Sequence, residues 1–595
     1  MFNRLKDKKW LLISIFCLFT VSIYGQETTG SIEGFVKDSA DAVVPNVTVT
    51  ISSAKGSGVG TTTTGIGTGF KRTVTTNENG FFRVLQVPPG LYDVVTTPSG
   101  GFGEARYENV NVAIGQTSQL AILVNPGDLV NTVNVSVSDA APIDTTNNAI
   151  QTTISAQKID LIPKTTGFTG LLKTVPGTRP ESRSGGFSVD GASGGENVFV
   201  IDGLEVTNYR TGTLNETFNL PTQLVQEIQV KSSGFEAAYG GATGGVVSGV
   251  TRGGNNEFHG DFGAQFTVPK FNGSPRPLLN RLTAGTVGAG TFTQKSEYYN
   301  PEKAMGTDFF PTANLGGPIL KDRLWFFTSY SPQIFNTEVN TQYFTQVSGT
   351  TNLVFNTSET YSRERKYEYA FARIDGNPTK NIRLTSTFLW NPVIDQGSIP
   401  SSSFSNVGSS AITIGNVPTA NYGGSVGILR GNQYTSKQGG RQSANAVTES
   451  GVYTPTSNFV VDGRYSRGFL NEKLGNYFVP TTVQIFSCGT PNVNFPCSTS
   501  GANSITVKDV SIRESYEFSA AYIFNAGGRH ELKGGYQRYT ILNDVQSGNN
   551  AIGRISFNYG TPISTLQPGV QDTPGAVGSA SFRRTGTNGK GSNLS

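Results

Sequence analysis

Few residues of this chain have the types and spacing that catalysis needs. The run Gly191-Ala192-Ser193-Gly194-Gly195 fits the G-x-S-x-G pattern of serine hydrolases. A nucleophilic serine of that kind needs a strand before it, a helix after it, and an acid and a histidine as partners. Here a strand-like run, Val198–Ile201, follows instead, and the whole chain has only two histidines, His259 and His530. We therefore predict no catalytic residues and expect the protein not to be an enzyme.

Two other sets of residues could carry site chemistry. Asp190 and Asp202 each precede a glycine, but no oxygen-rich cluster of six to eight ligands accompanies them, so they are expected to cap turns. We predict neither a metal nor a cofactor. Cys488 and Cys497 enclose a short loop with proline and asparagine, which favours a local disulfide in an oxidising compartment; two free thiols are the alternative.

The composition indicates strands and turns in several domains. The chain has 595 residues, of which 73 are glycine, 10% are aromatic and only 15% are charged. This is a poor composition for helices. The net charge of +4 gives no indication of nucleic-acid binding.

Residues 1–25 are typical of a secretory signal. A basic start precedes the apolar run Trp10–Ile23, and cleavage is expected between Gly25 and Gln26. A membrane anchor is the alternative, although the run is short for a span of ~20 apolar residues. No run of 18 apolar residues follows, so the mature chain is expected to be soluble or to cross a membrane as a closed β-barrel.

Residues 26–127 predict a small β-sandwich. Short alternating runs recur, and Asn77–Gly80 separates two of them in the manner of a hairpin turn. The segments GSIEGFVKDSADAVVPNVTVTI and TTNENGFFRVLQVPPGLYDV resemble the carboxypeptidase regulatory-like domain, whose fold is transthyretin-like and grouped with carbohydrate-binding-like sandwiches. This part has no histidine or cysteine, so it cannot hold a peptidase zinc site. Residues 56–69 form a Gly/Thr-rich insert, expected to be a loop.

Residues 139–255 contain short helical patterns at 154–163 and 169–175, then the buried strand Val198–Ile201 and the strand Ile228–Val230. The triplet Ile201-Asp202-Gly203, the run VQEIQV and the exit that begins at Gly244-Gly245 resemble the plug of a TonB-dependent outer-membrane receptor. Ser248-Gly249 departs from the family pattern, which has asparagine and an aliphatic residue there.

Residues 256–595 change to long alternating segments with aromatic residues near their ends, about 10–12 strands by their turn signals. The run LGGPILKDRLWFF, residues 315–327, resembles an early hairpin of Oar-like receptors. A closed receptor of this family has about twice as many strands, so this part is expected to be the N-terminal part of the barrel, with residues 269–307 and 395–445 as extracellular loops. A large soluble β-protein is the alternative.

The linker, residues 128–138, alternates valine with polar residues. Thr132-Val133-Asn134-Val135 resembles the TonB box, the segment that adds as a strand to TonB. The alternative is the last strand of the sandwich. The resemblance implies a chain in the outer membrane and its lipid, with the N-terminal domains facing the periplasm. It also implies partnership with TonB and ExbB/ExbD and uptake of an extracellular ligand, for which siderophores and carbohydrates are candidates. A non-transporting Oar-like protein for adhesion or envelope organisation is the other interpretation.

Overall fold

The computed structural model describes residues 28–594 with internal gaps. The gaps are residues 55–68, 98–99, 128–130, 135–148, 163–165, 182–184, 209, 236–238, 274–275, 277, 286–291, 300–302, 347–352, 398–412, 415–416, 419–438, 473–483, 490–497, 501–505, 526–528, 548–552, 560–578 and 585–591. The predicted signal with Gly25 and Gln26, most of the 56–69 insert, Val135 and Cys497 lie outside the described residues.

The N-terminal domain is a β-sandwich, as the sequence predicts. Its first sheet has the order β4-β1-β7, from β1 (Gly30–Asp38), β4 (Phe81–Val87) and β7 (Thr117–Val124). The second has the order β3-β2-β5-β6-β8, from β2 (Thr48–Ser53), β3 (Lys71–Thr75), β5 (Gly90–Thr96), β6 (Ala105–Val112) and β8 (Asn131–Asn134). Alternating apolar residues from the two sheets, among them Ile32, Val49, Phe82 and Val94, close one shared core between them.

The hairpin predicted across Asn77–Gly80 is wrong, although the turn itself is present. Gly80 has φ +66° and donates its N–H to the Asn77 carbonyl at 2.9 Å. However, β3 pairs with β2, whereas β4 pairs with β1, so the turn carries the chain from one sheet to the other. A hairpin turn and a turn between two sheets use the same residue types, so the turn sequence does not tell them apart. The available partner strands decide which pairing forms.

The plug domain is built on one five-stranded sheet. Its order is β13-β12-β15-β14-β9, from β9 (Ile150–Ser155), β12 (Val198–Ile201), β13 (Leu204–Glu205), β14 (Val225–Ser233) and β15 (Val246–Thr251). A separate pair consists of β10 (Thr178–Pro180) and β11 (Phe187–Val189). Short helices connect these strands: α2 (Ala156–Leu161), η1 (Phe168–Thr174), η2 (Gly194–Glu196), η3 (Glu216–Phe218) and η4 (Thr222–Leu224).

The plug confirms the predicted central strand and shortens the predicted first helix. All four residues of β12 are buried, and parallel pairing with β15 on one side and antiparallel pairing with β13 on the other place it inside the sheet. Residues 154 and 155 belong to β9, so α2 begins only at Ala156, with Ser155 at its N-cap. The sheet pairing of Ile154 with Ile228 outcompetes the helical spacing of its apolar residues.

The remaining chain forms a long antiparallel sheet, which we call the wall. It contains 12 strands: β16 (His259–Thr267), β19 (Asp308–Leu320), β20 (Leu324–Tyr330), β21 (Gln333–Gln346), β22 (Leu353–Tyr367), β23 (Ala370–Thr379), β24 (Ile382–Trp390), β25 (Val393–Gly397), β28 (Gly439–Thr456), β29 (Phe459–Asn471), β32 (Thr506–Asn525) and β33 (Arg529–Ser547). Strands β32 and β33 pair antiparallel along their length. Among the described strands, β16 and β33 lie at the two ends of the sheet and do not pair with each other.

Smaller elements lie between and after the wall strands. The predicted loop 269–307 contains η6 (Pro269–Phe271) and a hairpin of β17 (Leu278–Gly285) with β18 (Phe292–Tyr299). The predicted loop 395–445 contains the short pair β26 (Thr413–Ile414) and β27 (Val417–Pro418) and the start of β28. A further sheet is made by β30 (Gln484–Gly489), β31 (Ser498–Ser500), β34 (Gly553–Tyr559), β35 (Ser579–Arg584) and β36 (Ser592–Leu594).

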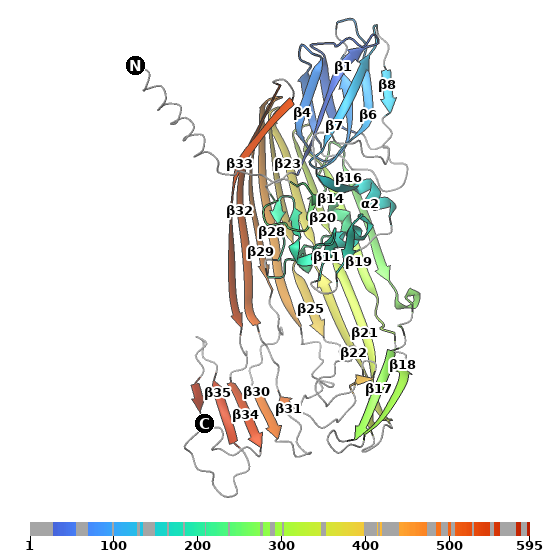
Figure 1. The fold of residues 1–595 in the computed structure, drawn as a ribbon, viewed down its shortest axis with the longest axis vertical. Helices are drawn as coiled ribbons and strands as arrows, with labels where there is room; N and C mark the ends of the chain where they lie inside the picture. The colour runs from blue at the N-terminus through green and yellow to red at the C-terminus, as the bar shows by residue number, and fades with distance from the viewer. Residues whose placement is uncertain are drawn as a thin grey trace, which may run out of the picture.

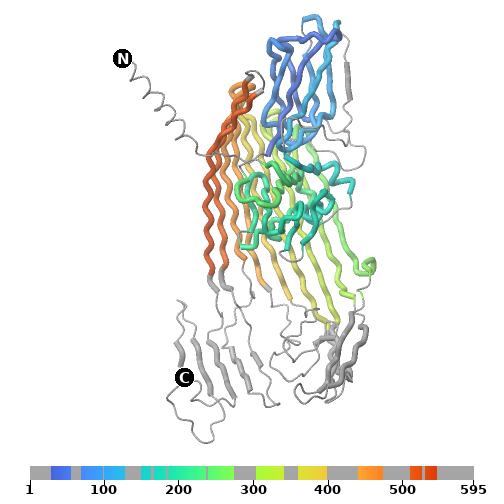
Figure 2. The backbone as a smooth tube through the Cα atoms, viewed as in Figure 1, coloured from blue at the N-terminus to red at the C-terminus, as the bar shows by residue number. Residues whose placement is uncertain are grey.

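The plug lies against one face of the wall (Figure 1). The sandwich lies above the plug, near the upper end of the wall in this view. The tube view shows the plug, in green, beside the wall strands, with the blue sandwich above it (Figure 2). A single apolar cluster spans both bodies, because Phe327 and Phe371 of the wall belong with Phe199, Leu204 and Phe218 of the plug. Within the described residues, no helix combines the length and the apolar character that crossing a membrane requires.

Candidate functional site

The triplet Ile201-Asp202-Gly203 forms the turn that joins β12 to β13. Asp202 and Gly203 both have positive φ, 48° and 83°, a geometry that matches the twist of a two-residue hairpin. The Asp202 carboxylate accepts hydrogen bonds from the Thr251 N–H at 2.9 Å and from the Thr251 hydroxyl at 2.7 Å. The triplet thereby ties the end of β15 to the turn, which is a structural role.

The same turn contacts the wall closely. A Cβ atom at Gly203 would lie 2.2 Å from Nη1 of Arg464 on β29, so a larger residue there would displace that guanidinium. Nη1 of Arg464 also donates to Glu517 Oε2 on β32 at 3.0 Å. Below the turn, Arg373 of β23 donates from Nη1 to the Thr251 carbonyl at 2.8 Å. Burial raises the pKa of Asp202, against the opposing charge of Arg373.

The two predicted glycines, Gly244 and Gly245, lie where the chain enters β15. A Cβ atom at Gly244 would lie 2.7 Å from Asn197 Oδ1, and one at Gly245 would lie 2.8 Å from the Val189 side chain. Asn197 is buried, and its Oδ1 accepts the Gly245 N–H at 2.8 Å. These glycines therefore permit close packing of β15 on β11 and the turn before β12.

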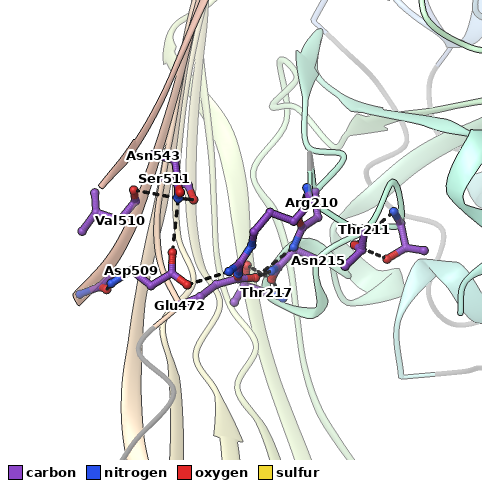
Figure 3. A network of polar contacts seen from close by, with 12 residues as sticks. Arg210, Thr211, Asn215, Thr217, Glu472, Asp509, Val510, Ser511 and Asn543 are labelled. Atoms are coloured by element: carbon purple, nitrogen blue, oxygen red, sulfur yellow. Dashed lines mark hydrogen bonds and ion pairs between the residues drawn. The ribbon is translucent and has the colours of Figure 1, made fainter. Parts of the chain in front are cut away.

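The plug loop after β13 is anchored to the wall by one arginine (Figure 3). Arg210 forms an ion pair with Glu472, and its Nη1 lies 2.8 Å from Asp509 Oδ2. Asn208 and Asn215 of the same loop also donate to Glu472 Oε1. The two acids are buried while the arginine is partly exposed, so the plug supplies the charge that two wall carboxylates need.

A second plug segment occupies a place where the wall strands are interrupted. Short breaks at residues 331–332, 368–369 and 391–392 lie side by side, since Ser331 N–H donates to the Tyr369 carbonyl and Glu368 N–H to the Pro392 carbonyl, both at 2.9 Å. The plug backbone around η3 is held at these breaks. The Tyr369 hydroxyl donates to the Asn219 carbonyl at 3.0 Å, and Asn391 Nδ2 donates to the Thr217 carbonyl at 2.6 Å.

The predicted TonB-box residues are described in part. Thr132, Val133 and Asn134 lie in β8, which pairs in parallel with β6 at the edge of the sandwich sheet, with Val133 opposite Tyr107. That pairing is the one the alternative interpretation expects. An edge strand of four residues retains a free side for a further strand. The assignment as a TonB box stays a prediction.

The other candidate residues are not brought together into a reactive site. Ser193 is the N-cap of η2, where it forms a capping box with Glu196, and its hydroxyl donates to Glu181 Oε2 at 3.2 Å. Cys488 lies in β30, and its pairing with Cys497 stays a prediction. In the part of the chain that the structure describes, no three His, Cys, Asp or Glu side chains gather in a way that could hold a metal.

The residues that join the plug to the wall lie far apart in the sequence, so no local pattern predicts their contacts. Arg210 of the plug and Asp509 of the wall are 299 residues apart in the sequence. Thr217 of the plug and Asn391 of the wall are 174 residues apart. A local feature of this region is the polar run NYRTGTLNETFN, residues 208–219. The aromatic residues of the sandwich are mostly core: Phe70 and Phe82 are each 2% exposed.

Comparison with known proteins agrees with these domains. Residues 142–246 match the TonB-dependent receptor plug domain, and residues 31–125 match the carboxypeptidase regulatory-like domain. The TonB-dependent transporter Oar of Myxococcus xanthus is 28% identical over 271 residues, which cover 44% of this chain and 24% of that protein. The two domain matches and the Oar relative support a TonB-dependent receptor. Both matched ranges of this receptor lie within the predicted domain boundaries.

Solved structures similar to the receptor are distant in sequence. The outer-membrane transporter YddB of Escherichia coli is 12% identical, with a TM-score of 0.46 over 75% of this chain and 52% of that one. The ferric enterobactin receptor of Pseudomonas aeruginosa, solved with enterobactin, is 13% identical, with a TM-score of 0.40 over 74% of this chain and 55% of that one. The receptor chain thus spans about half the length of these structures.

Proposed function

We propose that the receptor takes up a large extracellular ligand across the outer membrane, with energy supplied by TonB. In this arrangement the wall lies in the membrane, the plug blocks the passage along its inner face, and the sandwich and the 132–135 segment face the periplasm. ExbB and ExbD would power TonB from the inner membrane. The ligand is a siderophore, a glycan or a molecule of similar size.

The observation that carries this proposal is the inverted pattern of the wall strands. Along β32, Ser515, Glu517 and Ser519 are buried on the face toward the plug, whereas Tyr516 and Phe518 are 51% and 54% exposed on the other face. A soluble sheet buries its aromatic face and exposes its polar one. A transmembrane barrel does the reverse, because its outer face meets lipid and its inner face meets water or a plug.

A plug fastened to the inner face also fits transport. Its contacts with the wall combine apolar packing around Phe218 with ion pairs and hydrogen bonds such as those of Arg210. Each hydrogen bond or ion pair of this kind contributes only about 1–3 kcal/mol, so a pulling force can rearrange the plug without unfolding the wall. The segment at 132–135 comes before the plug in the sequence, and its residues 132–134 lie in strand β8, the kind of backbone that β-augmentation needs.

Binding of TonB is the first test. The purified periplasmic domain of TonB is titrated onto the full chain, onto Val133→Pro/Val135→Pro and onto Thr145→Pro, a control shortly after the linker. We expect the parent and Thr145→Pro to bind alike. The double variant should bind at least about tenfold more weakly, since proline removes the backbone donors that a paired strand uses. Equal binding by all three would contradict the proposed segment.

Uptake is the second test, and it separates transport from an adhesive role. Cells with the parent or the double proline variant are given ferric siderophores, cobalamin and fluorescent oligosaccharides as probes. Transport predicts accumulation of one probe class by the parent and its loss in the variant. Accumulation that is identical in both, together with unchanged adhesion of cells to surfaces, would contradict TonB-driven uptake.

A further inference from the structure

One face of the plug strand β14 is polar and yet fully buried. Glu227, Gln229 and Lys231 alternate along the strand, so their side chains share a face, and they are 2%, 0% and 0% exposed. The opposite face carries Ile228 and Val230, which belong to the apolar cluster between plug and wall. A buried polar row of this kind is stable only if other groups satisfy it.

The sandwich covers that polar face with the turn between β6 and β7. Ile114 N–H donates to Glu227 Oε1 at 2.6 Å, and Gln229 Nε2 donates to the Ile114 carbonyl at 2.5 Å. Two plug side chains therefore hold both backbone polar groups of one sandwich residue. The Ile114 side chain is itself fully buried. We call this pair of hydrogen bonds the latch.

The sandwich also touches the wall at separate points. The backbone of Gly69 packs on the indole of Trp325, since a Cβ atom there would lie 2.5 Å from that ring. The Phe70 ring lies 5.9 Å from the guanidinium carbon of Arg383. Different parts of the sandwich contact the plug and the wall. These contacts together fix the orientation of the sandwich at one end of the plug and the wall (Figure 1).

A polar cavity of about 70 Å³ lies at this three-way junction. Thr29, Gln86 and Pro88 of the sandwich, Asp202 of the plug, and Arg383 and Ser450 of the wall are among its lining residues. Among the described residues, Nη1 of Arg383, a lining residue of the cavity, is buried with no hydrogen-bond partner. A cavity of this size accommodates several water molecules. It is a space between plug and wall that the sandwich covers on one side.

We propose that the sandwich is a movable closure of this plug–wall space, and that the latch of Glu227 and Gln229 on Ile114 keeps it shut. The partner that fits the polar face of β14 is the chain's own sandwich. This inference rests on the proposed function, because passage along the inner face of the wall requires the closure to open. The sandwich has its own core, so it moves as a rigid domain when the latch hydrogen bonds exchange for bonds to water.

The test measures access to the cavity in the full chain, in isolated outer membranes. The natural cysteines are replaced by serine, and Ser450→Cys reports access through its rate of reaction with a maleimide. We expect Glu227→Ala/Gln229→Ala to raise the labelling rate roughly tenfold or more, as for the loss of two hydrogen bonds of ordinary strength. Gln226→Ala, a neighbour on the same strand that is also buried, should leave the rate unchanged.

A second variant acts from the sandwich side. Ile114→Pro removes the N–H that Glu227 accepts without altering the plug sequence, and it should also raise the rate. Thr217→Cys, fully buried in the plug, reports plug unfolding in parallel. Labelling of Ser450→Cys at the parent rate in both latch variants would overturn the closure. The labelling rate can also rise in the latch variants and yet be the same with and without active TonB. That result would support the closure and contradict TonB-driven uptake.

Discussion

Arg210 of the plug places its Nη1 2.8 Å from Oδ2 of Asp509 in the wall, across 299 positions of sequence. Asp509 is buried and also accepts a hydrogen bond from Asn543 Nδ2 at 3.3 Å. The Asn543 amide is neutral, whereas Arg210 supplies a positive charge to the carboxylate. The pair shows how the plug is held: by polar contacts at its rim, around an apolar centre. It also gives the first of four predictions.

Replacing Arg210 with alanine should weaken the hold of the plug on the wall. The change leaves the buried carboxylates of Asp509 and Glu472 without their cation, which we expect to lower the free energy of unfolding by about 1–3 kcal/mol. The partial exposure of Arg210 keeps the effect below that of a fully buried pair. Thermal unfolding of the solubilised chain measures it. Arg179→Ala, an exposed arginine of the same domain, is the control.

A double-mutant cycle tests whether Arg210 stabilises the plug through its contact with Asp509. In a double-mutant cycle with Asp509→Asn, the two changes should be less than additive, because either one removes the same contact. Strict additivity would show that Arg210 stabilises the plug without acting through Asp509.

Gly203→Ala should destabilise the plug more than an ordinary surface change. The residue has φ +83°, and an added Cβ would lie 2.2 Å from Arg464 Nη1. We expect a loss of roughly 1–3 kcal/mol from the backbone conformation, with displacement of Arg464 in addition. Gly249→Ala is the matched control, since its Cβ would meet its first neighbour at 3.9 Å. Denaturant unfolding that ranks Gly249→Ala as the more damaging change would contradict the proposed role of Gly203.

The latch should loosen as pH rises. Burial raises the pKa of Glu227 from 4.5 to about 8, against the favourable hydrogen bond from Ile114. A group with a raised pKa binds its proton more tightly when docked, so docking is most stable below 4.5 and loses stability progressively up to about 8. Hydrogen exchange at the Ile114 amide, corrected for the intrinsic rate, should show protection falling over this interval.

Glu227→Gln provides the comparison for that titration. Its amide oxygen still accepts the Ile114 N–H but carries no titrating proton, so protection should become independent of pH between 4.5 and 8. A parent and a variant that lose protection in parallel would show that another group controls docking.

Lysine on the outer face of the wall should be poorly tolerated. Leu315 is 49% exposed on β19, and a lysine there should cost about 2–4 kcal/mol if that face meets the bilayer interior. Leu123→Lys on the sandwich, where leucine is 41% exposed, should change stability by no more than about 0.5 kcal/mol, because that surface faces water. The yield of folded protein in the outer-membrane fraction compares the two. Equal yields would argue against a lipid-facing wall.

The local features of the sequence were predictable where short-range physics decides them. Val198–Ile201 is a buried strand because four consecutive apolar residues end at an Asp-Gly turn, and that turn has the expected left-handed geometry. The alternation of Ser515, Tyr516 and Glu517 similarly predicts a strand with two unlike faces. The period of a strand shows which side chains share a face, and residues such as Asp and Gly show where a strand ends.

Tertiary structure alone decided what those faces contact. The turn at Asn77–Gly80 joins two sheets instead of forming a hairpin, because β2 and β1 provide the partner strands. The VQEIQV run reads as an ordinary strand, yet its polar face is sealed by Ile114, more than a hundred positions earlier. The amino-acid sequence by itself determined local features such as the buried strand Val198–Ile201, its Asp-Gly turn and the two unlike faces of β32. The pairing of distant polar groups, which holds plug, wall and sandwich together, depends on long-range packing that no local pattern encodes.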